Sequence, residues 1–256
     1  MGKNKLARWQ ELNTFINVIQ PETANVAEND HPVKGNWKRN IFKNNNPIIL
    51  ELGCGKGEYS IGLAEMFPEN NFIGVDIKGA RMWRGAKTSN ERKMANVAFL
   101  RTRIEFIDRF FSEDEVDEIW ITFPDPHTKT RSTNKRLTSA WYLNKYVKFL
   151  KNNGIVHLKT DNAELFQYTR SVVKTNNLEE LFSSDNLYSN ELNPNDIITG
   201  VSDSLNLPAE NLLFVNDILS IKTFYEKQFL AKGMKITYLA FKLNKNNLLK
   251  NAEKNA

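Results

Sequence analysis

The sequence predicts an α/β domain in which a mostly parallel sheet is covered by helices, and three observations support this prediction. Short apolar runs alternate with segments whose apolar residues recur every three or four positions, a rhythm typical of repeated strand–helix units. A chain of 256 residues, 41% of them hydrophobic, can bury one sizeable core. A glycine-rich turn joins the first apolar run to the first helical segment, as in doubly wound folds.

Six apolar runs are expected to be strands, and each except the last is followed by an expected helix. The expected strands are 47–53, 71–77, 96–102, 117–123, 154–160 and 235–243. The expected helices are 58–67, 81–94, 104–111, 139–150 and 163–175. The α/β domain is therefore expected to occupy residues 47–243.

Three segments depart from this rhythm. Residues 1–46 are polar and interrupted by prolines, and we expect a basic, partly flexible extension that packs loosely. The segment 187–219 is too long for an ordinary connection and is expected to be an inserted surface segment. Residues 244–256 are rich in Lys and Asn and are expected to form a disordered tail.

Composition and charge limit the classes of function. The chain has 35 Lys and Arg against 30 Asp and Glu, a balance that favours contact with a polyanion. A single cysteine excludes an intramolecular disulfide framework, and three scattered histidines give no metal-ligand spacing, so we expect no metal. Neither a membrane-spanning run nor the apolar core of a signal peptide is present. We therefore expect a soluble, cytoplasmic protein without a membrane partner.

The strongest local signal is the glycine-rich turn ELGCGKG, which opens the first expected helix. Gly53, Gly55 and Gly57 let the backbone turn tightly and approach a ligand without Cβ interference. A dinucleotide fingerprint needs glycine where this chain has Glu58, which disfavours NAD. The acidic Glu51 suits a ligand with an ammonium or sulfonium group, as in S-adenosylmethionine, and would repel phosphates. A turn that merely connects strand to helix remains the alternative.

Asp76 ends the second expected strand, at the spacing this fold uses for an acid that binds both ribose hydroxyls. This position supports a cofactor site independently of the glycines, although Asp76 could instead cap the following helix. Cys54 is disfavoured as a nucleophile for pyrimidine methylation, because it lies inside the turn that should hold the cofactor.

An acidic turn and a basic run follow the fourth expected strand. Asp125 stands between two prolines at the strand end, where open α/β sheets bind ligands. Four basic residues come next: Lys129, Arg131, Lys135 and Arg136. Such a run is usually a solvated face, but beside a rigid acidic turn it favours a flap that grips phosphates.

Two more polar clusters lie near the ends of later strands. The sequence KTDN places Asp161 after the fifth expected strand, and TFYEK places Thr223, Tyr225 and Glu226 before the last one. Asp161 could instead cap its helix, and Tyr225 could belong to the core.

The motifs ELGCGKG, GVDIK, FPDPHTKTRSTNKRL, KTDN and TFYEKQF with a following Gly233 resemble, in this order, the motif series of the bacterial tRNA (guanine-N7)-methyltransferase family. The resemblance covers roughly residues 3–243. It implies a Rossmann-like class I methyltransferase fold, with a mostly parallel seven-stranded sheet, an antiparallel last strand and helices on both faces. It also implies S-adenosyl-L-methionine as cofactor and tRNA as partner, with methylation of guanosine 46 in the variable loop. The sequence leaves open whether the protein is a monomer or a homodimer.

The resemblance and the residue patterns together assign roles to individual positions. The cofactor-binding residues are expected to be Glu51, Gly53, Gly55, Gly57, Asp76, Arg103 and Asp125. The substrate-binding residues are expected to be Lys129, Asp161, Thr223, Tyr225 and Glu226, and the RNA-backbone contacts Arg131, Lys135 and Arg136. Asp125 is also the expected catalytic residue. The family commonly has Asp at the place of Arg103, where we expect backbone contact at most, and Trp-Pro at the place of His127-Thr128.

Two other functions stay open. A methyltransferase of the same fold could act on another RNA nucleobase, although exocyclic-amino enzymes typically show an Asp/Asn-Pro-Pro-aromatic turn, which differs from FPDPH. The chain could also be a catalytically silent RNA-binding module, and the joint presence of Glu51, Asp76 and Asp125 argues against that.

Overall fold

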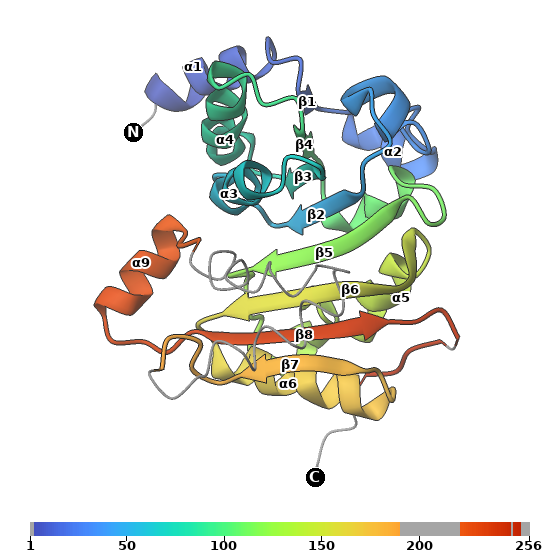
Figure 1. Ribbon diagram of the computed structural model, residues 1–256, viewed down its shortest axis with the longest axis vertical. Helices are drawn as coiled ribbons and strands as arrows, with labels where there is room; N and C mark the ends of the chain where they lie inside the picture. Colours follow the sequence, from blue (N-terminus) through green and yellow to red (C-terminus); the bar gives the residue numbers. More distant parts are fainter. Residues whose placement is uncertain (1–2, 190–220, 247, 252–256) are drawn as a thin grey trace.

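One eight-stranded sheet runs through the computed structural model, which describes residues 3–189, 221–246 and 248–251 (Figure 1). The strands are β1 (Val18–Ile19), β2 (Ile48–Leu52), β3 (Asn71–Asp76), β4 (Val97–Arg101), β5 (Val116–Thr122), β6 (Leu150–Thr160), β7 (Glu180–Ser184) and β8 (Thr237–Leu243). Their order is β1-β4-β3-β2-β5-β6-β8-β7, and only β8 runs antiparallel to its neighbours. All six strands expected from the sequence are present. β1 and β7 complete the sheet.

Helices cover both faces of this sheet, as expected. The α-helices are α1 (Lys3–Leu12), α2 (Thr23–Glu28), α3 (Glu58–Met66), α4 (Gly79–Glu91), α5 (Ala140–Tyr146), α6 (Ala163–Thr175) and α9 (Phe224–Ala231). A π-helical turn covers Trp37–Phe42, and 3-10 turns cover Ile104–Arg109 and Thr130–Lys135. Buried side chains of α1, α3 and α4 pack on one face, and those of α2, α5 and α6 pack on the other.

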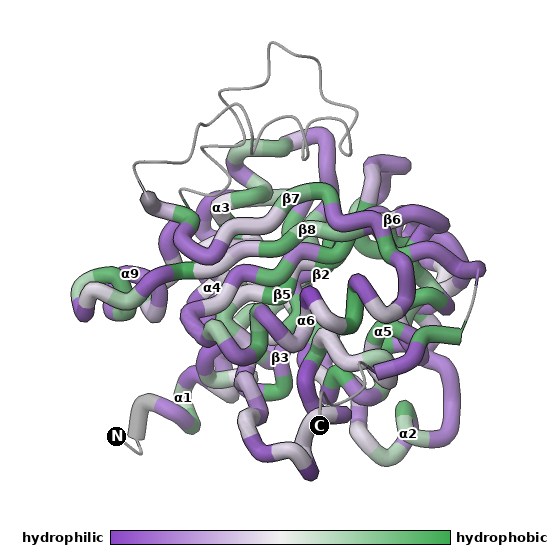
Figure 2. Tube along the Cα trace, turned by 90° about the horizontal axis from the view of Figure 1, so that it is seen from below, coloured by the Kyte–Doolittle hydropathy of each residue, from purple (hydrophilic) through white to green (hydrophobic). Residues whose placement is uncertain are grey.

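The central strands are apolar on both sides because both faces are covered. In β2, Ile48, Leu50 and Leu52 enter one core cluster and Ile49 enters the other. Figure 2 shows hydrophobic residues along the strands and hydrophilic residues in the peripheral loops.

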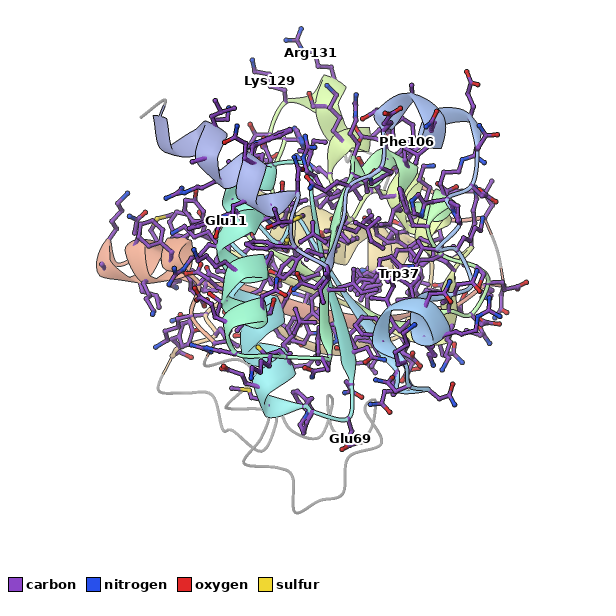
Figure 3. All side chains as sticks on the ribbon, turned by 90° about the horizontal axis from the view of Figure 1, so that it is seen from above. Glu11, Trp37, Glu69, Phe106, Lys129 and Arg131 are labelled. Atoms are coloured by element: carbon purple, nitrogen blue, oxygen red, sulfur yellow. The ribbon has the colours of Figure 1, made fainter. Side chains whose placement is uncertain are left out.

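The N-terminal extension packs more tightly than the sequence suggested. Leu12 of α1 is fully buried against α4, and the Glu11 carboxylate accepts hydrogen bonds from Trp83 Nε1 (2.7 Å) and Lys87 Nζ (2.8 Å). Trp37 is fully buried and donates its indole N–H to a backbone carbonyl at 2.8 Å (Figure 3). The expectation of loose packing is therefore wrong for the described part of this segment, because its apolar residues find partners far along the chain.

The C-terminal segment also differs from its predicted disorder at residues 248–251. Leu249 is buried in the core, and its backbone N–H and C=O both bond to the Asn144 side chain at 2.9 Å. Asn251 Oδ1 accepts hydrogen bonds from Ala140 N and Tyr168 Oη, each at 3.0 Å. Apart from residues 187–189, the predicted insertion at 187–219 lies outside the described residues.

The sheet topology sets where a ligand can bind. Strand order reverses between β2 and β5, which are parallel neighbours. The carboxyl ends of β2, β5 and β6 point to the left in Figure 1, and α9 lies at that edge. In open α/β sheets, ligands bind in the crevice at such a switch point.

Candidate active site

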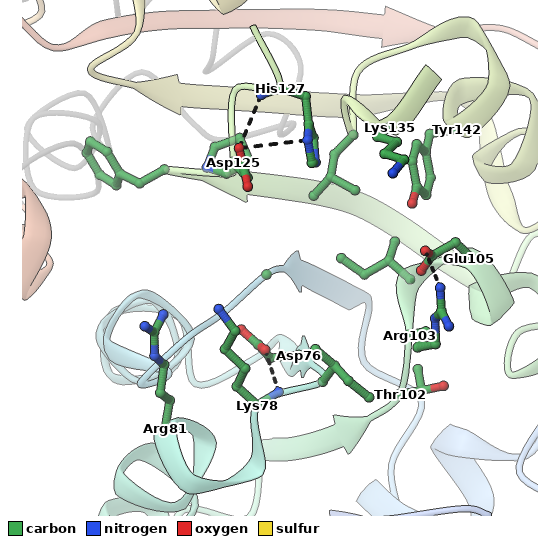
Figure 4. Close-up of a pocket in the computed structure, with 16 residues that line it drawn as sticks. Asp76, Lys78, Arg81, Thr102, Arg103, Glu105, Asp125, His127, Lys135 and Tyr142 are labelled. Carbon is green, nitrogen blue, oxygen red and sulfur yellow. Dashed lines mark hydrogen bonds and ion pairs between the residues drawn. The ribbon is translucent and has the colours of Figure 1, made fainter. Parts of the chain in front are cut away.

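A cavity of about 570 Å³ opens at the carboxyl edge of the sheet, a volume within the range typical of small-molecule sites. It is lined by Gly53, Asp76, Ile77, Lys78, Arg81, Thr102, Arg103, Ile104, Glu105, Phe123, Pro124, Asp125, His127, Lys135, Leu137 and Tyr142. Figure 4 shows Asp76 and Asp125 on opposite walls. The cavity therefore collects residues that follow β2, β3, β4 and β5, as the topology predicts.

The glycine turn supplies an open stretch of backbone at one wall. Gly53 lines the cavity with φ +79°, and a Cβ placed there would meet nothing within 4 Å. Gly57 has φ +69° and lies against the Phe99 ring, which an added Cβ would meet at 2.6 Å. Gly53 therefore leaves room for a ligand, whereas Gly57 lets the start of α3 pack closely on β4.

Asp76 is half-buried at the cavity wall and held by backbone donors. Its carboxylate accepts hydrogen bonds from Gly55 N (2.9 Å) and Lys78 N (2.7 Å). The N-cap of α4 is Lys78, so the alternative role of Asp76 as the helix N-cap is wrong. Asp76 thus ties the glycine turn to the end of β3 while its side chain borders the cavity.

Glu51 lies deeper than the sequence suggested. Its side chain is buried and accepts hydrogen bonds from Ser60 N (2.9 Å), Ser60 Oγ (2.6 Å) and Thr122 Oγ1 (2.7 Å). Burial, with a smaller contribution from the charge of Asp76, raises the pKa of Glu51 to about 7 against the opposing effect of these hydrogen bonds. Glu51 therefore joins β2, α3 and β5 beneath the turn, without lining the cavity.

Asp125 projects from the opposite wall into solvent. Its side chain is 75% exposed, and it accepts a hydrogen bond from His127 N at 3.2 Å. Phe123 and His127 have φ values of +49° and +44°, in the left-handed region that bulky residues rarely adopt. The Phe123 backbone N–H bonds to Lys159 O at 2.8 Å, which ties the start of this turn to β6. This turn holds Asp125 at the cavity wall, with most of its side chain open to solvent.

One end of the cavity carries a cluster in which Arg103 and Lys135 were predicted from the sequence and Glu105 and Tyr142 were not. Arg103 pairs with Glu105 at 3.0 Å, and Lys135 and Tyr142 line the cavity beside them (Figure 4). Burial and the nearby Glu105 charge raise the pKa of Tyr142 to about 12. We expected only backbone contact from Arg103, but its side chain has a carboxylate partner. Glu105, two residues after Arg103 in the sequence, was the signal that could have indicated this partner.

The basic run divides into exposed and buried members. Lys129 and Arg131 are exposed and point away from the body of the protein in Figure 3. Lys135 is exposed and also lines the cavity. Of the three, Lys135 is therefore the one placed to contact a ligand in the cavity.

Arg136 lies inside the protein, so its predicted contact with the RNA backbone is wrong. Its side chain is 6% exposed and pairs with Glu164 at 2.7 Å. It also donates to Pro126 O at 3.1 Å, and its guanidinium lies 4.4 Å from the Tyr168 ring centroid. Arg136 therefore anchors the loop that carries Asp125 to α6.

Asp161 is half-buried after β6, and burial raises its pKa. Asn162 caps α6, because its side chain accepts a hydrogen bond from Leu165 N at 2.8 Å. The alternative role of Asp161 as the helix cap is therefore wrong.

The residues of the TFYEK motif differ in how exposed they are. Thr223 and Glu226 form a reciprocal capping box at the start of α9, and Glu226 is fully buried. Tyr225 is 37% exposed, so it is not a core residue, and its ring centroid lies 5.8 Å from Arg81 Cζ. Of the three predicted substrate contacts in this motif, only Tyr225 is exposed beside a residue of the cavity.

Within the described ranges, no group of three His, Cys, Asp or Glu residues could hold a metal ion. No helix in that part of the chain combines the length and apolar character needed to cross a membrane.

The strand order, the antiparallel β8, the helices on both faces and the switch-point cavity define a class I methyltransferase fold. An antibiotic-related methyltransferase of known structure shares this fold, with a TM-score of 0.52 and 14% identity over 88% of this chain and 94% of its own.

A family profile described as "Putative methyltransferase" matches residues 45–238. The chain belongs to the tRNA (guanine-N7)-methyltransferase family. It is 47% identical to the Bacteroides fragilis protein of that name, over 95% of this chain and 87% of the relative. The Christiangramia forsetii relative is 46% identical over 94% of this chain and 99% of its own length.

Proposed function

We propose that this enzyme transfers a methyl group from S-adenosyl-L-methionine to N7 of a guanosine in the variable loop of tRNA, in the cytoplasm. One observation carries the proposal. Asp76 and Asp125 face the same cavity from opposite walls, next to the open backbone of Gly53. The names of relatives such as the Bacteroides fragilis protein support the choice of guanine N7 and tRNA.

The residues of the cavity fit the methyl donor. The Asp76 carboxylate borders the cavity and can accept hydrogen bonds from two ribose hydroxyls. Gly53 leaves space against its backbone. The negative charges of Asp76 and, once ionised, Glu51 favour a cationic ligand over a phosphate. Arg103 and Glu105 offer a donor and an acceptor at the other end of the cavity.

The reaction needs alignment more than proton transfer. The bound cofactor supplies a sulfonium methyl group; the guanine N7 lone pair forms the new N–C bond as the C–S bond breaks and sulfur keeps its electron pair. No proton leaves N7, so no general base is required. The purine ring becomes positively charged, and Asp125 on the facing wall can orient the base and stabilise that charge. Asp161 lies half-buried after the neighbouring strand, where it can accept hydrogen bonds from the base edge.

The rims of the cavity provide cations for the RNA backbone. Lys135 lines the cavity next to Tyr142, and Lys78 and Arg81 line it beside Asp76. Lys129 and Arg131 are exposed on the segment that follows Asp125 in the chain. Phosphate contacts of this kind position a nucleic acid and make its affinity fall with salt. Tyr225 beside Arg81 adds an exposed aromatic ring on which a base can stack.

The decisive experiment is to incubate the full-length protein with radiolabelled S-adenosylmethionine and an unmodified tRNA transcript, and then to map the label. We expect one labelled guanosine in the variable loop. Methylation at N7 makes that position sensitive to borohydride reduction and aniline cleavage, which identifies the atom. A matched transcript with adenosine at that position should take up no label. Label on a pyrimidine, on an exocyclic amino group or nowhere would contradict the proposal.

A further inference from the structure

A fully buried ion pair joins the end of β6 to the first turn of α9. Lys159 Nζ lies 2.8 Å from Glu226 Oε1, and both side chains have no exposed surface. Tyr188 Oη donates a second hydrogen bond to Glu226 Oε1 at 2.5 Å, and Lys159 Nζ donates to Ile221 O at 3.2 Å. The pair is therefore the centre of a hydrogen-bonded network at the carboxyl edge of the sheet.

The carboxylate of Glu226 is engaged at both oxygens. Oε1 accepts from Lys159 and Tyr188, and Oε2 accepts from the backbone N–H of Thr223 at 3.3 Å within the capping box. A substrate base could reach this group only after α9 had separated from β6. These contacts give Glu226 a role in holding the helix.

The helix that this pair holds contacts both turns that flank the cavity. Phe224 N donates to Glu58 Oε2 at 2.9 Å, and Lys56 Nζ lies 3.6 Å from the Phe224 ring centroid. Further along α9, the Phe229 ring lies 5.8 Å from the ring of Phe123, which begins the turn that carries Asp125. One short helix therefore touches the glycine turn and the acidic turn.

An ion pair suits this task for a physical reason. Burying two charges costs as much as their attraction returns, so apolar residues of similar volume could hold the helix equally well. A charged pair is more selective than apolar residues, because a shift of α9 that separates the two charges loses their attraction without removing the cost of burying them. The pair therefore determines where α9 lies more than it stabilises the folded protein.

We propose that Lys159 and Glu226 are positioning residues whose ion pair fixes α9 against β6, so that Phe224 and Phe229 hold the two turns of the active site in place. The proposal rests on the proposed function for its catalytic meaning. It gives Glu226 a positional role in addition to the contact with substrate that the resemblance implied.

The test uses the full-length protein and four variants: Lys159→Met, Glu226→Met, the double variant, and Phe224→Ala. The first readout is hydrogen–deuterium exchange, which needs no ligand. In each single Met variant we expect faster exchange in 224–231 and in the glycine turn. Exchange in the strands other than β6 should stay unchanged. The second readout is S-adenosylhomocysteine affinity, measured without tRNA. We expect about three- to tenfold weaker binding in the single Met variants and recovery to within about twofold in the double variant.

Phe224→Ala keeps the buried pair and removes an exposed contact with the glycine turn, so it remains informative if a Met variant does not fold. It should weaken S-adenosylhomocysteine binding by about threefold or more. Lys242→Met is the matched control, because it breaks the surface pair with Glu179 (3.0 Å) on the same sheet. It should change neither readout.

The possible outcomes separate the two proposals. If the wild-type protein does not bind S-adenosylhomocysteine, the proposed function fails, while the exchange data still test the docking of α9. If Glu226→Met and the double variant lose activity on tRNA with unchanged cofactor affinity and local exchange, Glu226 contacts the substrate and the positioning role is wrong. Unchanged exchange in both single Met variants, or unchanged cofactor affinity in Phe224→Ala, would also overturn it.

Discussion

The two walls of the active-site cavity are built differently. On the wall formed by β2 and β3, Glu51 is buried among three hydrogen-bond donors and Asp76 is held by two backbone N–H groups. On the facing wall, Asp125 is 75% exposed. Among the described residues, Lys129 and Arg131 have no ion-pair partner within 4.0 Å. The first wall is preorganised by the protein alone, whereas the second presents charges for a large polar partner to meet.

Removing Asp125 should produce the largest effect, and it changes only the exposed wall. For Asp125→Ala we expect methyl transfer to tRNA to fall about 100- to 1,000-fold, because the charge that develops on the purine loses a facing carboxylate. S-adenosylhomocysteine affinity should change less than about threefold, since Asp125 is mostly exposed. Single-turnover rates and calorimetric titration give the two quantities.

The matched control is Glu69→Ala, an exposed acid at the far end of the molecule in Figure 3. It should leave both quantities unchanged. Equal losses of transfer rate and cofactor affinity in Asp125→Ala would make Asp125 a cofactor ligand.

Glu51 gives the preorganised wall a pH dependence. Its pKa is raised from 4.5 to about 7 by burial, so between these values the folded protein keeps a proton that the unfolded chain has lost. The stability that this group contributes is present below about pH 4.5 and is lost as pH rises toward 7. A shift of this size corresponds to roughly 3 kcal/mol in the free energy of unfolding.

Urea unfolding of the cofactor-free protein between pH 5 and 8 measures this effect, and Glu51→Gln serves as the reference because its side chain cannot titrate. The wild-type free energy minus that of Glu51→Gln should fall with rising pH and level off above about pH 7. A difference that rises with pH, or that stays flat, is incompatible with a protonated Glu51 in the folded protein.

Local sequence patterns were sufficient for the frame of the fold and for the acids at strand ends. Strands, helices and the glycine turn depend on spacing within a few residues, which the sequence displays directly. Asp76 and Asp125 follow because strand ends in this topology meet at one edge. The packing of the N-terminal extension was missed because its buried residues depend on partners far along the chain: Leu12 packs against α4 and Trp37 stacks on Phe111.

The dependence of burial on distant partners also explains the errors within the site. Arg131 and Arg136 belong to one basic run, yet one is exposed and the other is buried. Arg136 is buried because it pairs with Glu164 and lies over the Tyr168 ring, both on α6. The burial of Glu226 on α9 likewise depends on a partner from β6, Lys159. Burial of a charge requires a partner, and the position of that partner is not a local property of the sequence.

Arg131 and Arg136 allow the smallest but most selective test of the two walls. Replacing exposed Arg131 with Ala should reduce the slope of log affinity for tRNA against log salt concentration by about one, while the melting temperature stays unchanged. Between 50 and 200 mM salt this corresponds to about a fourfold smaller change in affinity.

Arg136→Ala should keep the slope but lower the free energy of unfolding by about 1–3 kcal/mol, because its hydrogen bonds to Pro126 O and Glu164 are lost. Filter binding across a salt series and urea unfolding measure the two variants side by side. If Arg136→Ala changed the salt slope and Arg131→Ala did not, RNA would contact the anchored side of the loop, and the exposed wall would not be the binding surface.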